Sequence, residues 1–167
     1  DPTAVLALNE FGLEADTTVA AKKQTFTLAL LQRLKSSGVP VHALGMQAHL
    51  DWDTPLNATK LTNFMNAVAA EGLQIFISEL DVGDQTAPAN IDQRDRAVAD
   101  KYHEFLSIVL PHPAVKMVVL WGLSDRSSWL ILRKPRPDGL HVRVLPLDEP
   151  CIRQEAWLPI ANALRGY

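Results

Sequence analysis

Two carboxylates, Glu79 and Asp81, stand at the end of an apolar run that is typical of a buried strand. Residues 76–82 read FISELDV, and the four residues before them, GLQI, are mostly apolar as well. An ionised carboxylate in a dry environment costs several kcal/mol unless it is paired or hydrogen-bonded. The placement therefore indicates partners elsewhere in the chain, or carboxylates that are kept there for chemistry.

Polar side chains follow three other apolar runs of the sequence in the same way. Amides, a histidine and a tryptophan are prominent among them, and all lie just beyond the last apolar residue of a run. These residues are Asn9, Glu10, Gln47, His49, Trp121 and Asp125.

The apolar runs alternate with longer amphipathic stretches, which predicts an α/β fold. We expect strands over residues 5–8, 41–46, 73–80 and 115–121, and helices over residues 17–37, 56–70, 92–109 and 154–164. The spacing favours four parallel β/α units with helical crossovers, in a single domain over residues 1–167. A loop rich in Arg, Pro and Gly occupies residues 133–143.

The carboxyl ends of parallel strands meet at one edge of a sheet, where α/β folds carry their sites. We therefore expect the polar residues to gather there, with His49 as the natural partner of the two carboxylates. Asp81 lies two residues beyond Glu79, so it points to the same side of the strand and is suited to orient His49.

Each of these residues also has an ordinary structural interpretation when it is taken alone. A carboxylate can form an ion pair or start a loop, a histidine can be structural, an amide can lie in a loop or cap a turn, and a tryptophan can be core. For Asp125 we favour the interpretation as a cap. The shared position at strand ends favours a site formed by Asn9, Gln47, His49, Glu79, Asp81, Trp121 and Trp129.

The mixture of side chains narrows the chemistry of that site. There is no glycine-rich phosphate loop, no Gly-x-Ser-x-Gly elbow and, around His112 and His141, no spacing of metal ligands. Aromatic, carboxylate and amide side chains together are the lining expected of a sugar site, since carboxylates handle acetal chemistry. The sequence thus favours carbohydrate chemistry without a metal or other cofactor.

Three stretches resemble the last strands of the glycoside hydrolase family 10 xylanases, in the family's order and spacing. They are VPVHALGMQAHL (39–50), IFISELDV (75–82) and VVLWGLSDRSSWL (118–130). Residues 1–14 resemble the family's fifth strand, and LPLDEP with AWLPIANAL resemble its final loop and helix.

The resemblance implies strands 5–8 of a (β/α)8 TIM barrel and an endo-1,4-β-xylanase that retains configuration. It implies that Glu79 is the nucleophile and that His49 and Asp81 hold it ionised and correctly turned. Gln47, Trp121 and Trp129 would line the adjoining sugar subsite, and Asn9 matches a strand-end Asn of the family. The substrate would be β-1,4-xylan or its oligosaccharides, and the protein would be secreted.

The first four β/α units of such a barrel, with their general acid/base, have no counterpart in this sequence. Glu10 is a poor substitute, because the spacing from Asn9 to Gln47 fits a fifth strand followed directly by the sixth. The family's usual Asp, Tyr and Asn are replaced here by Glu10, Phe11 and Gly12. This departure concerns the details of substrate binding more than the class of enzyme.

Four parallel strands cannot close a barrel, so two strand edges and an apolar inner face need a cover. We expect the missing N-terminal half-barrel or a second copy of the chain to supply it, rather than rearranged segments of an open sheet. The alternative function is a catalytically silent xylan-binding or half-barrel assembly module. A metabolic β/α enzyme is disfavoured by the missing phosphate loop.

Composition excludes several other classes of protein. The 167 residues carry a net charge of −3, and the basic residues are scattered along the sequence. Proteins that bind nucleic acids instead carry clustered basic residues, so this class is excluded. No apolar run approaches the roughly 18 residues of a membrane span. Cys151 is alone, so no internal disulfide can form, and a start at Asp1 indicates that the chain derives from a longer one.

Overall fold

The computed structural model describes residues 1–165, so positions 166 and 167 of the predicted domain lie outside it. The strands are β1 (Ala7–Glu10), β2 (Ala43–Met46), β3 (His49–Asp51), β4 (Gln74–Gly83) and β5 (Val115–Leu120). The helices are α1 (Thr18–Ser36), α2 (Ala58–Ala70), α3 (Ile91–Val109), α4 (Leu130–Arg133) and α5 (Trp157–Arg165), with a 3-10 turn at Asp125–Ser127.

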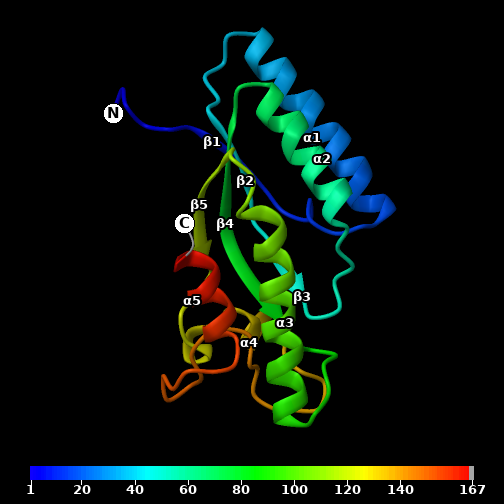
Figure 1. Cartoon of the computed structure of the whole chain (residues 1–167), viewed down its shortest axis with the longest axis vertical. Coiled ribbons are helices and arrows are strands. Elements are labelled where there is room, and N and C mark those ends of the chain that lie inside the picture. Colours follow the sequence, from blue (N-terminus) through cyan, green and yellow to red (C-terminus); the bar gives the residue numbers. More distant parts are fainter. Residues whose placement is uncertain (166–167) are drawn as a thin grey trace.

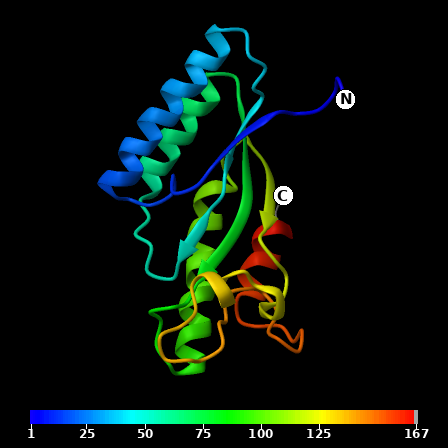
Figure 2. The ribbon, with the colours of Figure 1, turned by 180° about the vertical axis from the view of Figure 1, so that it is seen from behind.

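The strands form one parallel sheet in the order β1–β2–β4–β5, and β3 pairs with the last part of β4. Figures 1 and 2 show the chain from opposite sides, and residues of α1, α2, α3 and α5 pack with the sheet in one core. The predicted α/β class with parallel β/α units is confirmed.

The core lies between the sheet and the helices. Leu44 and Met46 of β2 and Ile75, Ile77, Leu80 and Val82 of β4 point into it, together with the apolar faces of α2 and α3, and the alternation along β4 is interrupted between Ile77 and Leu80. Fully buried members include Leu44, Met46, Ile75, Ile77, Met65, Tyr102 and Phe105. Because these side chains fill only the helix-facing side, the opposite side of the sheet is free to carry polar groups.

The ends of the helices follow from local capping. The side chain of Thr17 accepts a hydrogen bond from the amide of Ala20, and Asn57 does the same for Lys60 at the start of α2. Asn90 caps α3 through the amide of Gln93. The predicted helices therefore agree with the observed ones to within a few residues.

The strand predictions need three corrections. β1 runs from Ala7 to Glu10 rather than over residues 5–8, because its pairing with β2 sets its bounds, and Asn9 and Glu10 therefore lie within it. β3 was not predicted, since a left-handed residue, Ala48, separates it from β2. β4 continues to Gly83 rather than ending at residue 80, so Asp81 lies within the strand as Glu79 does.

Cys151 is the second non-glycine residue with a left-handed backbone in the described chain, at φ 66°. It lies in a turn closed by hydrogen bonds to Asp148, and its thiol is exposed. This backbone region costs an ordinary residue roughly 1–2 kcal/mol, which glycine avoids. We expect Cys151→Gly to raise the free energy of unfolding by about 1 kcal/mol in urea denaturation.

Cys151→Ser is the matched control for this prediction, because serine keeps the unfavourable backbone and changes only an exposed group. Its stability should stay within about 0.5 kcal/mol of the unmodified chain. A lower urea midpoint for Cys151→Gly than for Cys151→Ser would show that the turn is not under strain.

The side of the sheet away from the helices is open at β5. Met117 and Val119 point to this side and are 42% and 36% exposed, whereas Val118 and Leu120 pack on the core. Within the described residues β1 pairs only with β2 and β5 only with β4, so each has a free edge. None of the described helices is long and apolar enough to cross a membrane.

Candidate functional site

The carboxyl ends of the strands bring the predicted residues to one cleft. It has a volume of about 460 Å³, and its lining comes from the segments that follow β1, β2 and β5 and from β4 itself. The lining residues are Phe11, Gly12, Gln47, His49, Glu79, Trp121 and Trp129. Asn9 and Asp81 do not line the cleft, but both bond directly to residues that do.

His49 lies between the two carboxylates of β4. Its Nδ1 is 2.9 Å from Oδ1 of Asp81, and its Nε2 is 3.2 Å from Oε2 of Glu79. The pairing of β3 with β4 sets this geometry, because it places His49 directly opposite Asp81. The two carboxylates thus share one imidazole, as the sequence predicts.

Asp81 is only 1% exposed, yet both of its oxygens are bonded. Oδ1 faces His49, and Oδ2 accepts a hydrogen bond of 2.6 Å from the indole nitrogen of Trp129. Asp81 therefore fixes the orientation of two cleft residues at once.

The second oxygen of Glu79 is held from β1. Asn9 donates from Nδ2 to Oε1 of Glu79 at 2.7 Å, and the hydroxyl of Ser78 donates to Oδ1 of Asn9 at 2.6 Å. Because Ser78 occupies the amide oxygen, the amide nitrogen is directed to Glu79. Ser78 was missed by sequence analysis, because strict alternation would place it on the opposite side of the strand from Glu79; the register of β4 with β5 is irregular between Ile77 and Leu80, and Ser78 and Glu79 both reach Asn9.

Gly45 makes room for Asn9 on the neighbouring strand. A Cβ on Gly45 would lie 2.5 Å from Oδ1 of Asn9, far closer than such atoms approach. The glycine of β2 is therefore a condition for the hydrogen bond between Asn9 and Glu79.

The environment of His49 favours its charged form. Burial alone would lower its pKa, but the hydrogen bonds and negative charges of Asp81 and Glu79 outweigh burial and raise the pKa above 6.5. A raised folded-state value means that His49 contributes stability below pH 6.5, which is lost as the pH rises through the folded-state pKa.

We expect His49 to titrate above 6.5 when its ring protons are followed by NMR, and Asp81→Asn to lower that midpoint. His112 provides an internal reference, since burial lowers its pKa. An unchanged His49 midpoint in Asp81→Asn would contradict the proposed coupling.

Aromatic rings wall the cleft around His49. Trp129 and Trp121 have ring centroids 4.9 Å and 6.2 Å from the imidazole, and both keep a large exposed surface. Phe11 adds a third ring, under the ammonium of Lys23 at 3.3 Å from its centroid. Phe11 and Gly12 were not predicted to line the cleft; an exposed aromatic directly after a strand end was the available signal.

Glu10 is poorly suited to donate a proton. Its carboxylate lies 2.9 Å from Nζ of Lys23, and this hydrogen bond lowers its pKa despite some burial. A general acid needs a pKa raised towards neutrality. Among the described residues that line the cleft, Glu79 is the one carboxylate.

Asp125 secures the loop that carries Trp129. Oδ1 accepts from the amides of Val144 and Leu145, and Oδ2 accepts from Gln154. Burial raises the pKa of Asp125 to about 6, against the opposing effect of these hydrogen bonds. Asp125 therefore caps the segment that follows the long loop, at Val144 and Leu145, as the sequence interpretation favoured.

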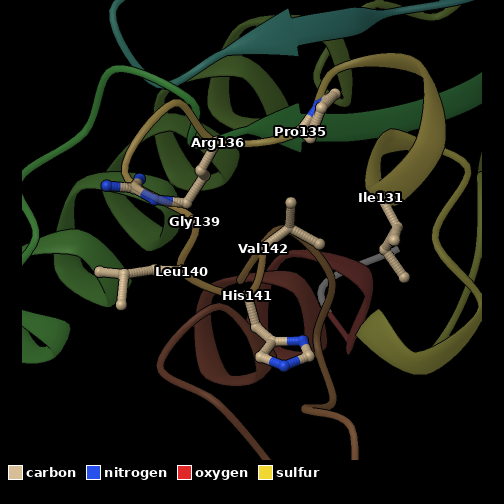
Figure 3. Close-up of a pocket in the computed structure, with 7 residues that line it drawn as sticks. All are labelled: Ile131, Pro135, Arg136, Gly139, Leu140, His141 and Val142. Carbon is tan, nitrogen blue, oxygen red and sulfur yellow. The ribbon is translucent and has the colours of Figure 1, made fainter.

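A separate hollow of about 210 Å³ lies in the long loop, away from the cleft (Figure 3). Its lining is mostly apolar, and the guanidinium of Arg136 is occupied by Asp138 and by the carbonyls of Asp84 and Ala87. Across residues 1–165, no group of three His, Cys, Asp or Glu side chains could hold a metal ion.

Comparison with known proteins gives one consistent result. The model of glycosyl hydrolase family 10 matches residues 1–163. Endo-1,4-beta-xylanase B of Thermotoga neapolitana is 29% identical over 78% of this chain and 36% of its own length. Endo-1,4-beta-xylanase C of Paenibacillus barcinonensis is 30% identical over 78% of this chain and 12% of its own.

Solved structures agree over nearly the whole chain. Native xylanase 10B from Thermotoga maritima superposes with a TM-score of 0.85 at 28% identity, covering 99% of this chain and 48% of that one. Xylanase 10B from Thermotoga petrophila, in complex with xylobiose, gives 0.85 at 29% identity with the same coverage. The chain thus spans about half the length of these structures, and less of the curated relatives.

Proposed function

The chain belongs to glycosyl hydrolase family 10, and from this we propose that it is the nucleophile-bearing half of a retaining endo-1,4-β-xylanase. The observation that carries the proposal is the geometry of Glu79, whose two oxygens are held by Asn9 and His49 at the floor of an aromatic cleft. A carboxylate held in this way is oriented and, as part of the cleft lining, accessible to a sugar.

In the proposed reaction, a carboxylate oxygen of Glu79 attacks the anomeric carbon of a xylosyl unit as the glycosidic bond breaks. The result is a covalent glycosyl ester, which water then hydrolyses, so that two inversions retain the configuration. His49 and Asn9 keep Glu79 turned towards the sugar, and Asp81 fixes His49 from behind.

The substrate we propose is β-1,4-xylan or its oligosaccharides. The faces of Trp121 and Trp129 are suited to stack on pyranose rings, and the amide of Gln47 can bond their hydroxyls. Because the polymer lies outside cells, we propose that the protein acts there; detection in the culture medium of its source tests this.

A retaining glycosidase needs a second carboxyl group about 5–5.5 Å from the nucleophile. Glu79 is the one carboxylate of the described cleft lining, and the solved structures that superpose on this chain are about twice as long. We therefore propose that the general acid/base comes from a complementing N-terminal half-barrel, which would also cover the open side of the sheet.

The second candidate is a catalytically silent xylan-binding or assembly module. The lack of a second carboxylate in the described cleft favours it for the chain on its own. This candidate predicts binding of xylo-oligosaccharides with no hydrolysis, and binding that survives Glu79→Gln.

Hydrolysis of a nitrophenyl β-xylobioside tests the proposal, first with the chain alone and then with a family N-terminal half-barrel added. The nitrophenolate leaves with little help from a general acid, so an assembled nucleophile suffices for release. Release that is absent under both conditions, with binding retained, would favour the silent module instead.

A further inference from the structure

Glu14 is a buried carboxylate that lies outside the cleft and accepts hydrogen bonds from two backbone amides. It lies in the loop between β1 and α1 and is only 3% exposed. Its Oε1 accepts from the amide of Ala48 at 3.0 Å, and its Oε2 accepts from the amide of Leu13 at 2.8 Å. The first of these bonds joins two segments 34 residues apart.

Ala48 has an unusual backbone at the break between β2 and β3. Its φ is 62°, a left-handed value, and the residue is fully buried. A buried amide without a partner costs about 1–3 kcal/mol. Glu14 supplies that partner, and so stabilises a turn that the alanine itself disfavours.

The peptide unit joining Gln47 to Ala48 is bonded at both of its ends. Its N–H donates to Glu14, and its carbonyl accepts the amide of Glu79 at 3.0 Å. The next carbonyl, that of Ala48, accepts the amide of Asp81 at 3.4 Å. One peptide unit therefore separates Glu14 from the backbone of the candidate nucleophile.

We propose that Glu14 is a positioning residue, which holds the left-handed turn at Ala48 and thereby sets the places of His49 and Glu79. Its effect on turnover rests on the proposed function of Glu79, whereas its effect on the backbone rests on the hydrogen bonds alone. The residue acts through the Gln47–Ala48 peptide and does not touch the sugar.

A carboxylate suits this task because each oxygen receives one N–H. Glutamine offers a single acceptor oxygen, and its NH₂ group would face the other amide. Glu14→Gln should therefore preserve one of the two hydrogen bonds, and Glu14→Ala neither.

The experiment compares Glu14→Ala, Glu14→Gln and a matched control, Gln24→Ala. Gln24 anchors the same loop through a 2.7 Å bond to the carbonyl of Leu13. The first readout is the pair of amide resonances of Ala48 and Glu79 in the NMR spectrum. The second is kcat and KM for the nitrophenyl β-xylobioside, with the protein in whichever form turns it over.

We expect Glu14→Ala to shift both amide resonances and to lower kcat about 10- to 100-fold, because small displacements of reacting groups cost this much. KM should change less than about threefold, and Glu14→Gln should recover part of kcat. Gln24→Ala should leave the Glu79 amide unshifted and kcat within about threefold.

An unshifted Glu79 amide in Glu14→Ala, or an equal loss in Gln24→Ala, overturns the inference. If the unmodified protein releases no nitrophenol, the proposed function fails, but the amide resonances still decide the role of Glu14. If Glu14→Ala does not fold, the test passes to Glu14→Leu, which fills the buried site but has no oxygen to accept either N–H, and unshifted Ala48 and Glu79 amides in that variant overturn the inference.

Discussion

Glu79→Ala is expected to lower turnover of a nitrophenyl β-xylobioside on the order of 10⁴-fold or more, the scale seen when a covalent nucleophile is removed. The reason lies in the cleft, where Glu79 is the one carboxylate among the described lining residues. His49 and Asn9 can orient a nucleophile but cannot replace it. The measurement is the rate of nitrophenolate release, made with the chain or with its complemented form.

Covalent labelling tests the same prediction without turnover. A dinitrophenyl xylobioside with fluorine at C2 should form a glycosyl ester that hydrolyses slowly, because fluorine destabilises the oxocarbenium-like transition state. Mass spectrometry of the digested protein should then find the sugar on the peptide that contains Glu79. A sugar found on Glu10 instead would contradict the assignment.

Glu79→Gln provides the matched control, because it keeps the shape of the side chain and removes its charge. The space left in Glu79→Ala can admit azide or formate as an external nucleophile, whereas glutamine fills that space. We expect azide to restore release only in the alanine variant, with a product of inverted configuration. Restoration in both variants, or a product of retained configuration, would point to another nucleophile.

The pairing of His49 with Asp81 could be predicted from the sequence, because alternation along β4 puts Glu79 and Asp81 on one side. Neighbouring parallel strands then bring the end of β2 to the same edge. The helices were predictable for a similar local reason, since caps such as Thr17 and Asn57 act within one turn.

The turn at Ala48 could not be predicted, because alanine rarely takes a left-handed backbone and no glycine or asparagine announces it. The hydrogen bond from Trp129 to Asp81 was hidden for another reason. It spans 48 residues through a loop without periodic pattern, so nothing local specifies it. What escaped sequence analysis is therefore the set of long-range bonds that orient the cleft residues.

The second large effect concerns the open side of the sheet. We expect the chain to associate at micromolar concentration, because Met117 and Val119 leave apolar surface in water beside a free strand edge. Full burial of such a side chain from water is worth about 1.5–3 kcal/mol, and association would gain the part that belongs to the surface still exposed. Sedimentation velocity measures the outcome, and a monodisperse monomer would contradict it.

Replacing both Met117 and Val119 with glutamate should abolish this association. Neither side chain packs on the helix-facing core, so the fold should survive, whereas burying two carboxylates costs several kcal/mol. Val39→Glu is the matched control, because Val39 is similarly exposed but lies between α1 and β2, a strand that does not pair with β5. It should leave association unchanged.

The same variants distinguish the two partners that could cover the open side of the sheet, a second copy of the chain and an N-terminal half-barrel. A second copy would bring only the residues of this same sequence and not the general acid of the first four β/α units. Self-association alone should therefore not raise turnover of an unactivated xylo-oligosaccharide. An N-terminal half-barrel that supplies the second carboxylate should raise it, and the double glutamate variant should prevent the increase. Turnover of that oligosaccharide by the self-associated chain would mean that a carboxylate within this sequence acts as the acid.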